Sequence, residues 1–287
     1  MKTPTIKQLR YFIALTETEH FGQAAEACFV SQSAFSNAIK ELETLLGVQL
    51  VDRTNRSVTI AAVGQQIASH ARLVLQDLES LVEVAEGRGA PLTGELRLGV
   101  IPTIAPFVLP TLLPKLRKAY PELKLFLIED QTQRVYERLQ DGEVDLLLLA
   151  LPWPMRSAET LTLYKDRFCL AARPNYTNDG VLLLEDGHCL RDHALDACRI
   201  RNAQKIQPFG ASSLLTLVEM VDADLGITFL PEMAKGTTLL KNTRVKLTEL
   251  PESSHRSIGL AWRKGSARVE EFKLFGEFLK KNRKLTR

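Results

Sequence analysis

Two cysteines, Cys189 and Cys198, lie nine positions apart in the run EDGHCLRDHALDAC. Gly187 separates a strand-like apolar stretch from a helical one, so we expect Cys189 in the first turn of a helix. Free backbone amides and the helix dipole stabilise a thiolate there. Because the thiolate is the form that attacks peroxide, we expect oxidation of Cys189 to sulfenic acid and its resolution by Cys198 as a disulfide.

The residues beside Cys189 carry charge. His188 and Arg191 bring positive character, which lowers a thiol pKa. Asp192 opposes this effect unless it pairs with Arg191 or binds the oxidant. The net expectation is an activated thiol.

The spacing of the two cysteines has a geometric consequence. Nine residues of one helix separate two Cα atoms by roughly 13 Å and turn them about half a circle apart. A disulfide needs Cα atoms within roughly 7 Å. The helix must therefore unwind or rearrange to form the bond, which would make oxidation of Cys189 and Cys198 a change of fold.

Other interpretations of these cysteines remain open. They could be ordinary core residues, although Cys28 and Cys169 fit that description better because their neighbours are apolar. A zinc site is also conceivable, since Cys189 and His193 are four apart on one helical face, but Cys198 lies off that face. We expect no metal and no cofactor.

The sensor run lies in a long segment where strand and helix patterns alternate. Apolar alternation predicts strands and amphipathic spacing predicts helices in the order βαβαβ, which favours a parallel sheet. The predicted elements are strands at 96–100, 123–127 and 146–149, helices at 108–120 and 135–140, further strands at 168–172, 181–184 and 226–230, and a closing helix around 272–279. Two such lobes commonly bind small ligands in the cleft between them.

A different pattern occupies the first sixty residues. Ser31 is a candidate N-cap and Gly47 a candidate stop for a helix whose apolar stripe is Phe35, Ile39, Leu42 and Leu46. The opposite face and the following hairpin at 49–60 supply groups that can contact base edges and phosphates, namely Ser31, Gln32, Ser33, Ser36, Asn37, Lys40, Arg53 and Arg56. This pattern favours a winged helix-turn-helix, with a solvated helix face as the alternative.

The charge of this unit limits its affinity for DNA. Six basic side chains stand against six acidic ones in residues 1–60, so the unit is formally neutral although the whole chain carries +3. Binding to DNA must then depend on where the charges lie and on several copies acting together.

A helical stretch from Gly64 to Ala85 connects the two patterns. Its apolar residues alternate steps of four and three, which predicts a dimerisation seam formed by Ile67, Ala71, Val74, Leu78, Leu81 and Ala85. Gly87 to Pro91 then breaks the helix. We therefore expect domains at 1–61, 62–92 and 93–287.

Composition excludes several classes of protein. The chain has 287 residues, 45% of them hydrophobic, and contains no apolar run of membrane-spanning length. We see no secretory signal pattern at the N-terminus, so we expect a cytoplasmic protein, no membrane, and thiols that are normally reduced.

Residues 8–64 resemble the DNA-binding domain of LysR-type transcription regulators, on the positions His20-Phe21, Ala24-Ala25, Ser31-Gln32, Leu42-Glu43, Leu46-Gly47 and Arg53. Ser33 and Val51 depart from residues common there. The resemblance implies a winged helix-turn-helix, a linker helix and a two-lobed α/β, periplasmic-binding-protein-like effector domain. It also implies double-stranded promoter DNA as partner, a homo-oligomer, and possible contact with RNA polymerase.

The stretch LLLEDGHCLRDHALDAC is similar to the sensor motif of the peroxide-responsive members of that family. That similarity makes Cys189 the peroxidatic and Cys198 the resolving residue. It assigns peroxide binding and support of the thiolate to Thr103, Thr132, His188, Arg191, Asp192 and Arg263. A thiol reductant such as glutaredoxin or thioredoxin is the implied partner for resetting the switch.

The predicted function is a non-enzymatic, tetrameric regulator that senses hydrogen peroxide and controls oxidative-stress genes. One alternative is a LysR-type regulator that binds a small anionic metabolite in the cleft. A thiol peroxidase is a second alternative, but it would not need residues 1–60. The segment 174–180 is short for the family and Leu215 stands where an acidic residue is common.

Overall fold

The structure is a computed structural model and describes residues 3–53, 58–85, 91–198 and 205–282. It divides into two compact units. The first comprises residues 1–89 with 140–143, and the second comprises residues 90–139 with 144–287. Each unit has its own core.

The first unit is a three-helix domain with a hairpin and a long helix. Its elements are α1 (Ile6–Thr18), α2 (Phe21–Ala27), α3 (Gln32–Leu46), the antiparallel strands β1 (Val51–Arg53) and β2 (Val58–Ile60), and α4 (Ala62–Ala85). Phe12, Leu15, Phe35, Ile39 and Leu42 are completely buried. Burial of these apolar side chains, one stripe from each helix, holds the domain together.

Local sequence signals fix the ends of α3. The Ser31 hydroxyl accepts a hydrogen bond from the amide of Ala34 over 3.3 Å. Gly47 ends the helix with φ +70°, a left-handed conformation that favours glycine. Both predicted helix ends are confirmed.

Helix α4 is buried only along its first turns. Ala68 and Ala71 are buried, and Ile67 packs against the core of the domain. Val74, Leu81 and Val82 are exposed by 51%, 63% and 46%. Val74 and Leu81 of the predicted seam, together with Val82, thus form an apolar surface of this unit. The predicted break at 87–91 lies mostly outside the described residues.

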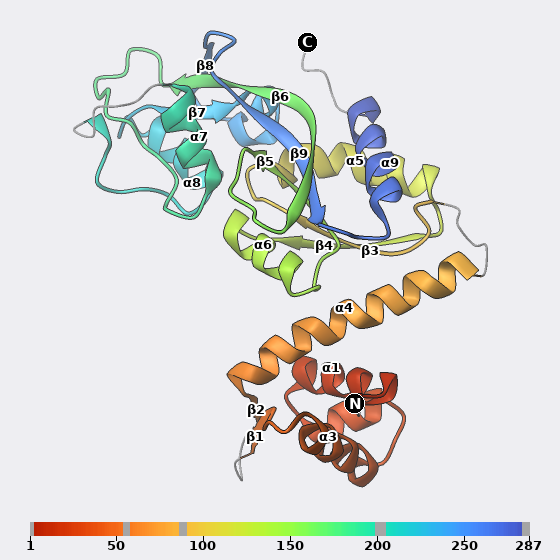
Figure 1. Ribbon diagram of the computed structural model, residues 1–287. Coiled ribbons are helices and arrows are strands. Elements are labelled where there is room, and N and C mark those ends of the chain that lie inside the picture. Colours follow the sequence, from red (N-terminus) through yellow and green to blue (C-terminus); the bar gives the residue numbers. More distant parts are fainter. Residues whose placement is uncertain (1–2, 54–57, 86–90, 199–204, 283–287) are drawn as a thin grey trace. The chain divides into compact units, whose positions relative to one another are not determined.

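The second unit contains two lobes joined by long strands. In the first lobe β4 (Leu123–Glu129), β3 (Gly94–Val100) and β5 (Leu146–Leu151) are parallel neighbours, as predicted. Every residue of β5 is buried. Helices α5 (Ala105–Ala119) and α9 (Val269–Asn282) lie on one side of this sheet and α6 (Thr132–Gln140) on the other (Figure 1).

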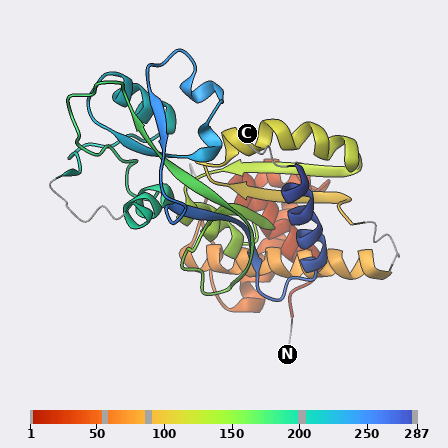
Figure 2. The same ribbon diagram turned by 90° about the horizontal axis from the view of Figure 1, so that it is seen from above.

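Strands β6 (Ala158–Ala172) and β9 (His255–Arg263) pair antiparallel and run from one lobe into the other, as the long green and blue strands of Figure 2 show. The second lobe adds β7 (Thr228–Pro231) and β8 (Lys246–Glu249), both antiparallel to β6, and helices α7 (Cys189–Ala197) and α8 (Leu214–Asp222). Among the described residues, the lobe also contains the short 3-10 helices η2 (Glu232–Ala234) and η3 (Thr238–Leu240).

The segment 181–184 differs from its prediction. It makes only isolated bridges, with Ile206, Ile227 and Ala211, rather than a regular strand. Its apolar side chains are nevertheless buried, which explains the strand-like pattern in the sequence. In the described residues, no helix is long and apolar enough to cross a membrane.

Candidate functional site

Cys189 is the first residue of helix α7, as the sequence predicts. His188 is the N-cap, with extended backbone, and Gly187 before it has φ +95°. A Cβ at Gly187 would lie 2.6 Å from the side-chain oxygen of Gln131. The left-handed conformation at the entry to the sensor helix favours glycine, while the close approach involves only the flexible end of Gln131, which can shift.

The two cysteines of the sensor helix belong to different hydrophobic cores. Cys189 is only 1% exposed and lies in the core of the first lobe, whereas Leu190 and Ala194 of the same helix lie in the core of the second. Cys198, the C-cap of α7, is half-buried against the second core. Both are free thiols. A bond between them requires the Cys189 side chain to leave the first core or Cys198 to approach it.

Burial, rather than the helix dipole, dominates the pKa of Cys189. Removal of the thiol from water raises its pKa. The nearby Thr132 hydroxyl, the positive charge of Arg256 and the Ala150 backbone lower the pKa and so oppose that effect, while Asp192 adds to it. The expected low-pKa thiol is therefore not what this reduced structure contains.

Arg256 is the cation that acts on this thiol. It is fully buried on β9, opposite Asp166 on β6, and its Nε donates to Asp166 Oδ2 over 3.0 Å. Its Nη1 and Nη2 donate to Thr103 Oγ1 and to the Thr103 carbonyl oxygen, over 3.0 and 2.9 Å. Burial raises the pKa of Asp166 and the Arg256 charge opposes that rise.

The sequence predicts that Arg263 supports the thiolate, but the arginine that acts on the Cys189 thiol is Arg256. Arg263 lies at the other end of β9, paired with Ala158, roughly 23 Å along the strand from Arg256. Both arginines belong to β9, and only the register of β9 with β6 shows which of them lies near the thiol. Sequence reasoning missed Arg256 because its context, RSIGL, resembles an ordinary buried strand.

Thr103 and Thr132 are buried near Arg256 and the thiol respectively, and their binding of peroxide stays a prediction. Both are buried, at 2% and 1% exposure. Since Thr103 Oγ1 accepts from Arg256, its own hydroxyl hydrogen remains available for another acceptor. Thr132 Oγ1 is buried without a hydrogen-bond partner of ordinary geometry among the described residues, although it lies near enough to the Cys189 thiol to lower its pKa.

Three other predicted residues do not form a charged cluster at the thiol. His188 is buried, and its pKa is lowered by that burial, so the ring is neutral near pH 7. Arg191 donates to the Leu184 carbonyl oxygen and pairs with Asp186 at 3.1 Å. Asp192 is exposed.

The C-terminal end of the sensor helix α7 is held by burial of Cys198 and by a hydrogen bond from Ser254. Burial raises the pKa of Cys198 to about 12, so this thiol is protonated near pH 7. The buried hydroxyl of Ser254 donates to the carbonyl oxygen of Ala197 over 3.0 Å. Ser254 also accepts from the Phe168 amide through its own carbonyl, which links the end of α7 to β6.

Most of the predicted DNA-binding residues lie on helix α3 or cap it. Gln32, Ser33, Asn37 and Lys40 are exposed and Ser36 is half-buried, while Ser31 serves as the N-cap. Arg53 lies in β1, but its side chain and Arg56 are outside the described residues. The predicted polar face is therefore present on α3, and the wing stays a prediction.

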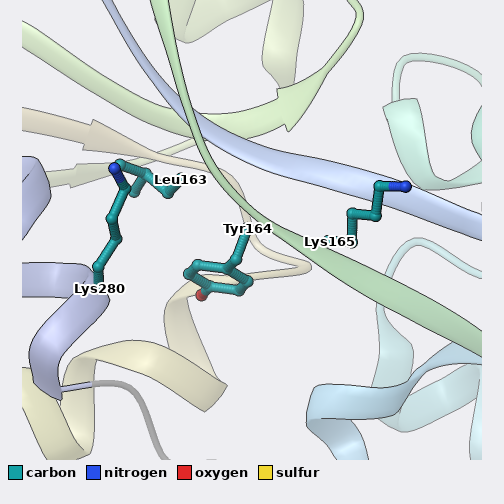
Figure 3. Close-up of a pocket in the computed structure, with 4 residues that line it drawn as sticks. All are labelled: Leu163, Tyr164, Lys165 and Lys280. Carbon is teal, nitrogen blue, oxygen red and sulfur yellow. The ribbon is translucent and has the colours of Figure 1, made fainter.

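Two surface hollows lie elsewhere in the second unit. One, of about 480 Å³, is lined by Leu163, Tyr164, Lys165 and Lys280; in Figure 3 the two lysines lie on opposite sides of Tyr164. The other, of about 330 Å³, is lined by Leu151, Pro152, Trp153, Thr160, Thr162 and Ser257, none of them charged. The lining of the first hollow thus contains two cations, and that of the second contains none. The described residues also contain no cluster of three His, Cys, Asp or Glu side chains suited to a metal.

Comparison with known proteins identifies the family. Residues 6–65 match the bacterial regulatory helix-turn-helix protein family named after LysR, and residues 89–284 match the LysR substrate binding domain. The chain belongs to the LysR family of transcription regulators. Two matched segments thus account for the two units of this LysR-type regulator.

Relatives of this LysR-type regulator carry two kinds of name. The HTH-type transcriptional regulator EstR of Acinetobacter baylyi is 39% identical and covers 97% of both chains. The hydrogen peroxide-inducible genes activator of Haemophilus influenzae is 36% identical and covers 91% of both. A full-length OxyR variant from Pseudomonas aeruginosa has a similar structure, with TM-score 0.80 at 28% identity, covering 97% of this chain and 98% of that one.

Proposed function

We propose that this LysR-type regulator senses hydrogen peroxide by reversible formation of a disulfide between Cys189 and Cys198. The observation that carries the proposal is the setting of Cys189: a buried thiol within reach of the hydroxyl of Thr132 and the charge of Arg256. Hydroxyl groups can hold a small neutral oxidant, and a fixed positive charge stabilises the thiolate that attacks it.

The oxidation is a balanced reaction of two thiols with one peroxide. The Cys189 thiolate forms a bond to one peroxide oxygen, the O–O bond breaks, and the leaving hydroxide takes a proton to become water. Cys198 then attacks the sulfenic sulfur and releases a second water. A thiol reductant such as glutaredoxin or thioredoxin resets the pair.

The separate cores of the two cysteines couple this chemistry to conformation. In the reduced helix the Cα atoms are roughly 13 Å apart, too far for a disulfide. Because Cys189 anchors α7 in the first lobe and Cys198 packs in the second, bond formation rearranges the contact between the lobes. Such a rearrangement can change how copies of the chain are spaced on DNA.

Assembly is the second part of the proposal. Val74, Leu81 and Val82 are exposed on α4, and an apolar helix surface of this kind suits pairing with a second copy. A dimer through α4, doubled to a tetramer, would place several α3 helices on promoter DNA. Formal neutrality of residues 1–60 favours this multivalent binding.

Response to a small anionic metabolite is the rival function, and the name of the relative EstR, unlike those of the peroxide-inducible activators, does not mention peroxide. The smaller hollow does not favour it, because its lining is uncharged, whereas the larger hollow carries Lys165 and Lys280 and keeps an anion as an outcome of the test.

The test is mass spectrometry of the reduced protein after exposure to micromolar peroxide. We expect both thiols to disappear into one intramolecular Cys189–Cys198 bond and the DNA footprint to change with them. If both thiols remain free while a metabolite shifts the footprint, the peroxide function is refuted.

A further inference from the structure

His193 is a titratable residue on the sensor helix that the proposed function does not use. It follows Cys189 by four positions on α7, and side chains so spaced lie on the same helix face, roughly 5–6 Å apart at Cβ. Both therefore project from α7 toward the same neighbour.

That neighbour is the end of strand β5. His193 Nε2 lies 3.0 Å from the carbonyl oxygen of Pro152, the residue after β5. The backbone of Ala150, two positions earlier, acts on the Cys189 thiol and lowers its pKa. Two residues of extended chain span roughly 7 Å, so the imidazole and the thiol both lie against the same short stretch at the end of β5.

The contact with Pro152 fixes which imidazole nitrogen carries the hydrogen. A carbonyl oxygen can only accept, so Nε2 donates and Nδ1 of the neutral ring bears a lone pair. Nδ1 is buried and has no hydrogen-bond partner among the described residues. A buried acceptor without a partner is costly and calls for a ligand or a proton.

A second buried group without a hydrogen-bond partner lies beside the same thiol. It is the Thr132 hydroxyl, which acts on the pKa of Cys189. Hydrogen peroxide has two O–H donors and two acceptor oxygens, so it can satisfy a hydroxyl and an imidazole nitrogen at once. The thiol, the hydroxyl and the imidazole thus complement one peroxide molecule.

We infer that His193 is the proton acceptor and donor for oxidation of Cys189 by hydrogen peroxide, acting through Nδ1 while its Nε2 remains bonded to Pro152. Nδ1 takes the proton from the Cys189 thiol, and the resulting thiolate attacks one peroxide oxygen. The S–O bond forms as the O–O bond breaks, and the imidazolium returns the proton to the leaving hydroxide, giving sulfenic acid and water. This inference rests on the proposed peroxide function.

The charges around His193 suit both steps. Burial is the main effect that lowers the pKa of His193, and Arg256 on β9 lowers it further, while Asp192 and Asp196 on α7 and the Pro152 carbonyl oppose the change. The ring is therefore neutral near pH 7 and can accept a proton. Once protonated near Arg256, it is a ready donor to hydroxide.

The inference is tested by the rate of sulfenic acid formation at Cys189 between pH 5 and 8. Cys198→Ser serves as the background, because it stops the reaction before the disulfide. In the Cys198→Ser protein, His193 acts as a base with a pKa below 6.5, so the rate increases from pH 5 to about 6.5 and is then constant up to pH 8. His193→Gln keeps an amide donor for Pro152 but has no titratable lone pair. We expect a rate about 100-fold lower at pH 7 that rises about tenfold per pH unit, since only preformed thiolate reacts.

Controls separate this role from a purely structural one. His193→Leu removes both the donor and the acceptor, and His70→Gln changes an exposed histidine on α4. If His193→Gln keeps the level profile within threefold and only His193→Leu is slow, His193 merely holds the helix and the inference is overturned. If the Cys198→Ser background itself forms no sulfenic acid, the peroxide function fails and this inference with it.

Discussion

Removal of the Ser254 hydroxyl should make the disulfide between Cys189 and Cys198 harder to reduce. In the reduced structure Ser254 donates to the carbonyl oxygen of Ala197, the residue before Cys198. Formation of the disulfide must move Cys198 by several ångströms relative to Cys189, so Ala197 moves too and this bond is lost. The hydroxyl therefore stabilises the reduced form alone.

The size of the effect follows from the single bond that is removed. A neutral hydrogen bond contributes about 1 kcal/mol net, which corresponds to a roughly fivefold change in an equilibrium constant. For a two-electron couple, that free energy is about 20 mV. Ser254→Ala destabilises the reduced form, so its reduction potential should become more negative by about this amount.

The assay is a redox titration against dithiothreitol or glutathione buffers, with the free thiols alkylated and counted by mass spectrometry. Thr243→Ala is the matched control, because it removes a hydroxyl that likewise donates to a carbonyl oxygen, that of Leu240 at the end of η3, over 3.0 Å. An unchanged potential in Ser254→Ala, or a shift toward easier reduction, would show that the Ser254–Ala197 bond survives oxidation and that the reasoning is wrong.

Three further perturbations test other parts of the site. Arg256→Met should raise the pKa of Cys189 still further and slow its alkylation, and it should destabilise the fold by about 3–5 kcal/mol because Asp166 is left buried without its cation. The first effect is measured by thiol alkylation at a series of pH values and the second by urea unfolding. An unaltered alkylation profile would contradict the role of Arg256. Ser36→Glu should weaken specific DNA binding about 10- to 100-fold, which corresponds to the loss of one base contact of roughly 1–3 kcal/mol, and should leave thiol oxidation intact. An unchanged DNA footprint would show that this face of α3 does not contact DNA. The pKa of Cys198 is raised to about 12, so the unfolded chain releases this proton at lower pH than the folded chain, and the free energy of unfolding should fall between about pH 9 and 12. Cys198→Ser should make the free energy of unfolding, measured with urea, fall less steeply with pH. Equal slopes in the two proteins would argue against the raised pKa.

Much of the fold follows from local sequence signals. The cap at Ser31, the stop at Gly47 and the apolar stripe of Phe35, Ile39 and Leu42 define α3, since each depends on residues within a few positions. The parallel strands of the first lobe follow from alternating strand and helix patterns. The segment 181–184 was mistaken for a strand because burial on all sides gives the same apolar pattern as a strand does.

The chemistry of the sensor was predicted only in part. The sequence by itself determined the two thiols, their spacing on one helix and the glycine before them, because these are properties of a short continuous segment. It could not determine the pKa of Cys189, because that depends on how completely the fold removes the thiol from water.

The partners of the thiol were decided by tertiary structure. The register of β6 against β9 puts Arg256, not Arg263, beside Thr103 and the thiol, and packing of α7 on the end of β5 brings His193 to Pro152. These residues come from segments far apart in the chain, and their meeting depends on strand register and helix packing. The sequence therefore determined which group can be oxidised, and the fold determined which groups act on it.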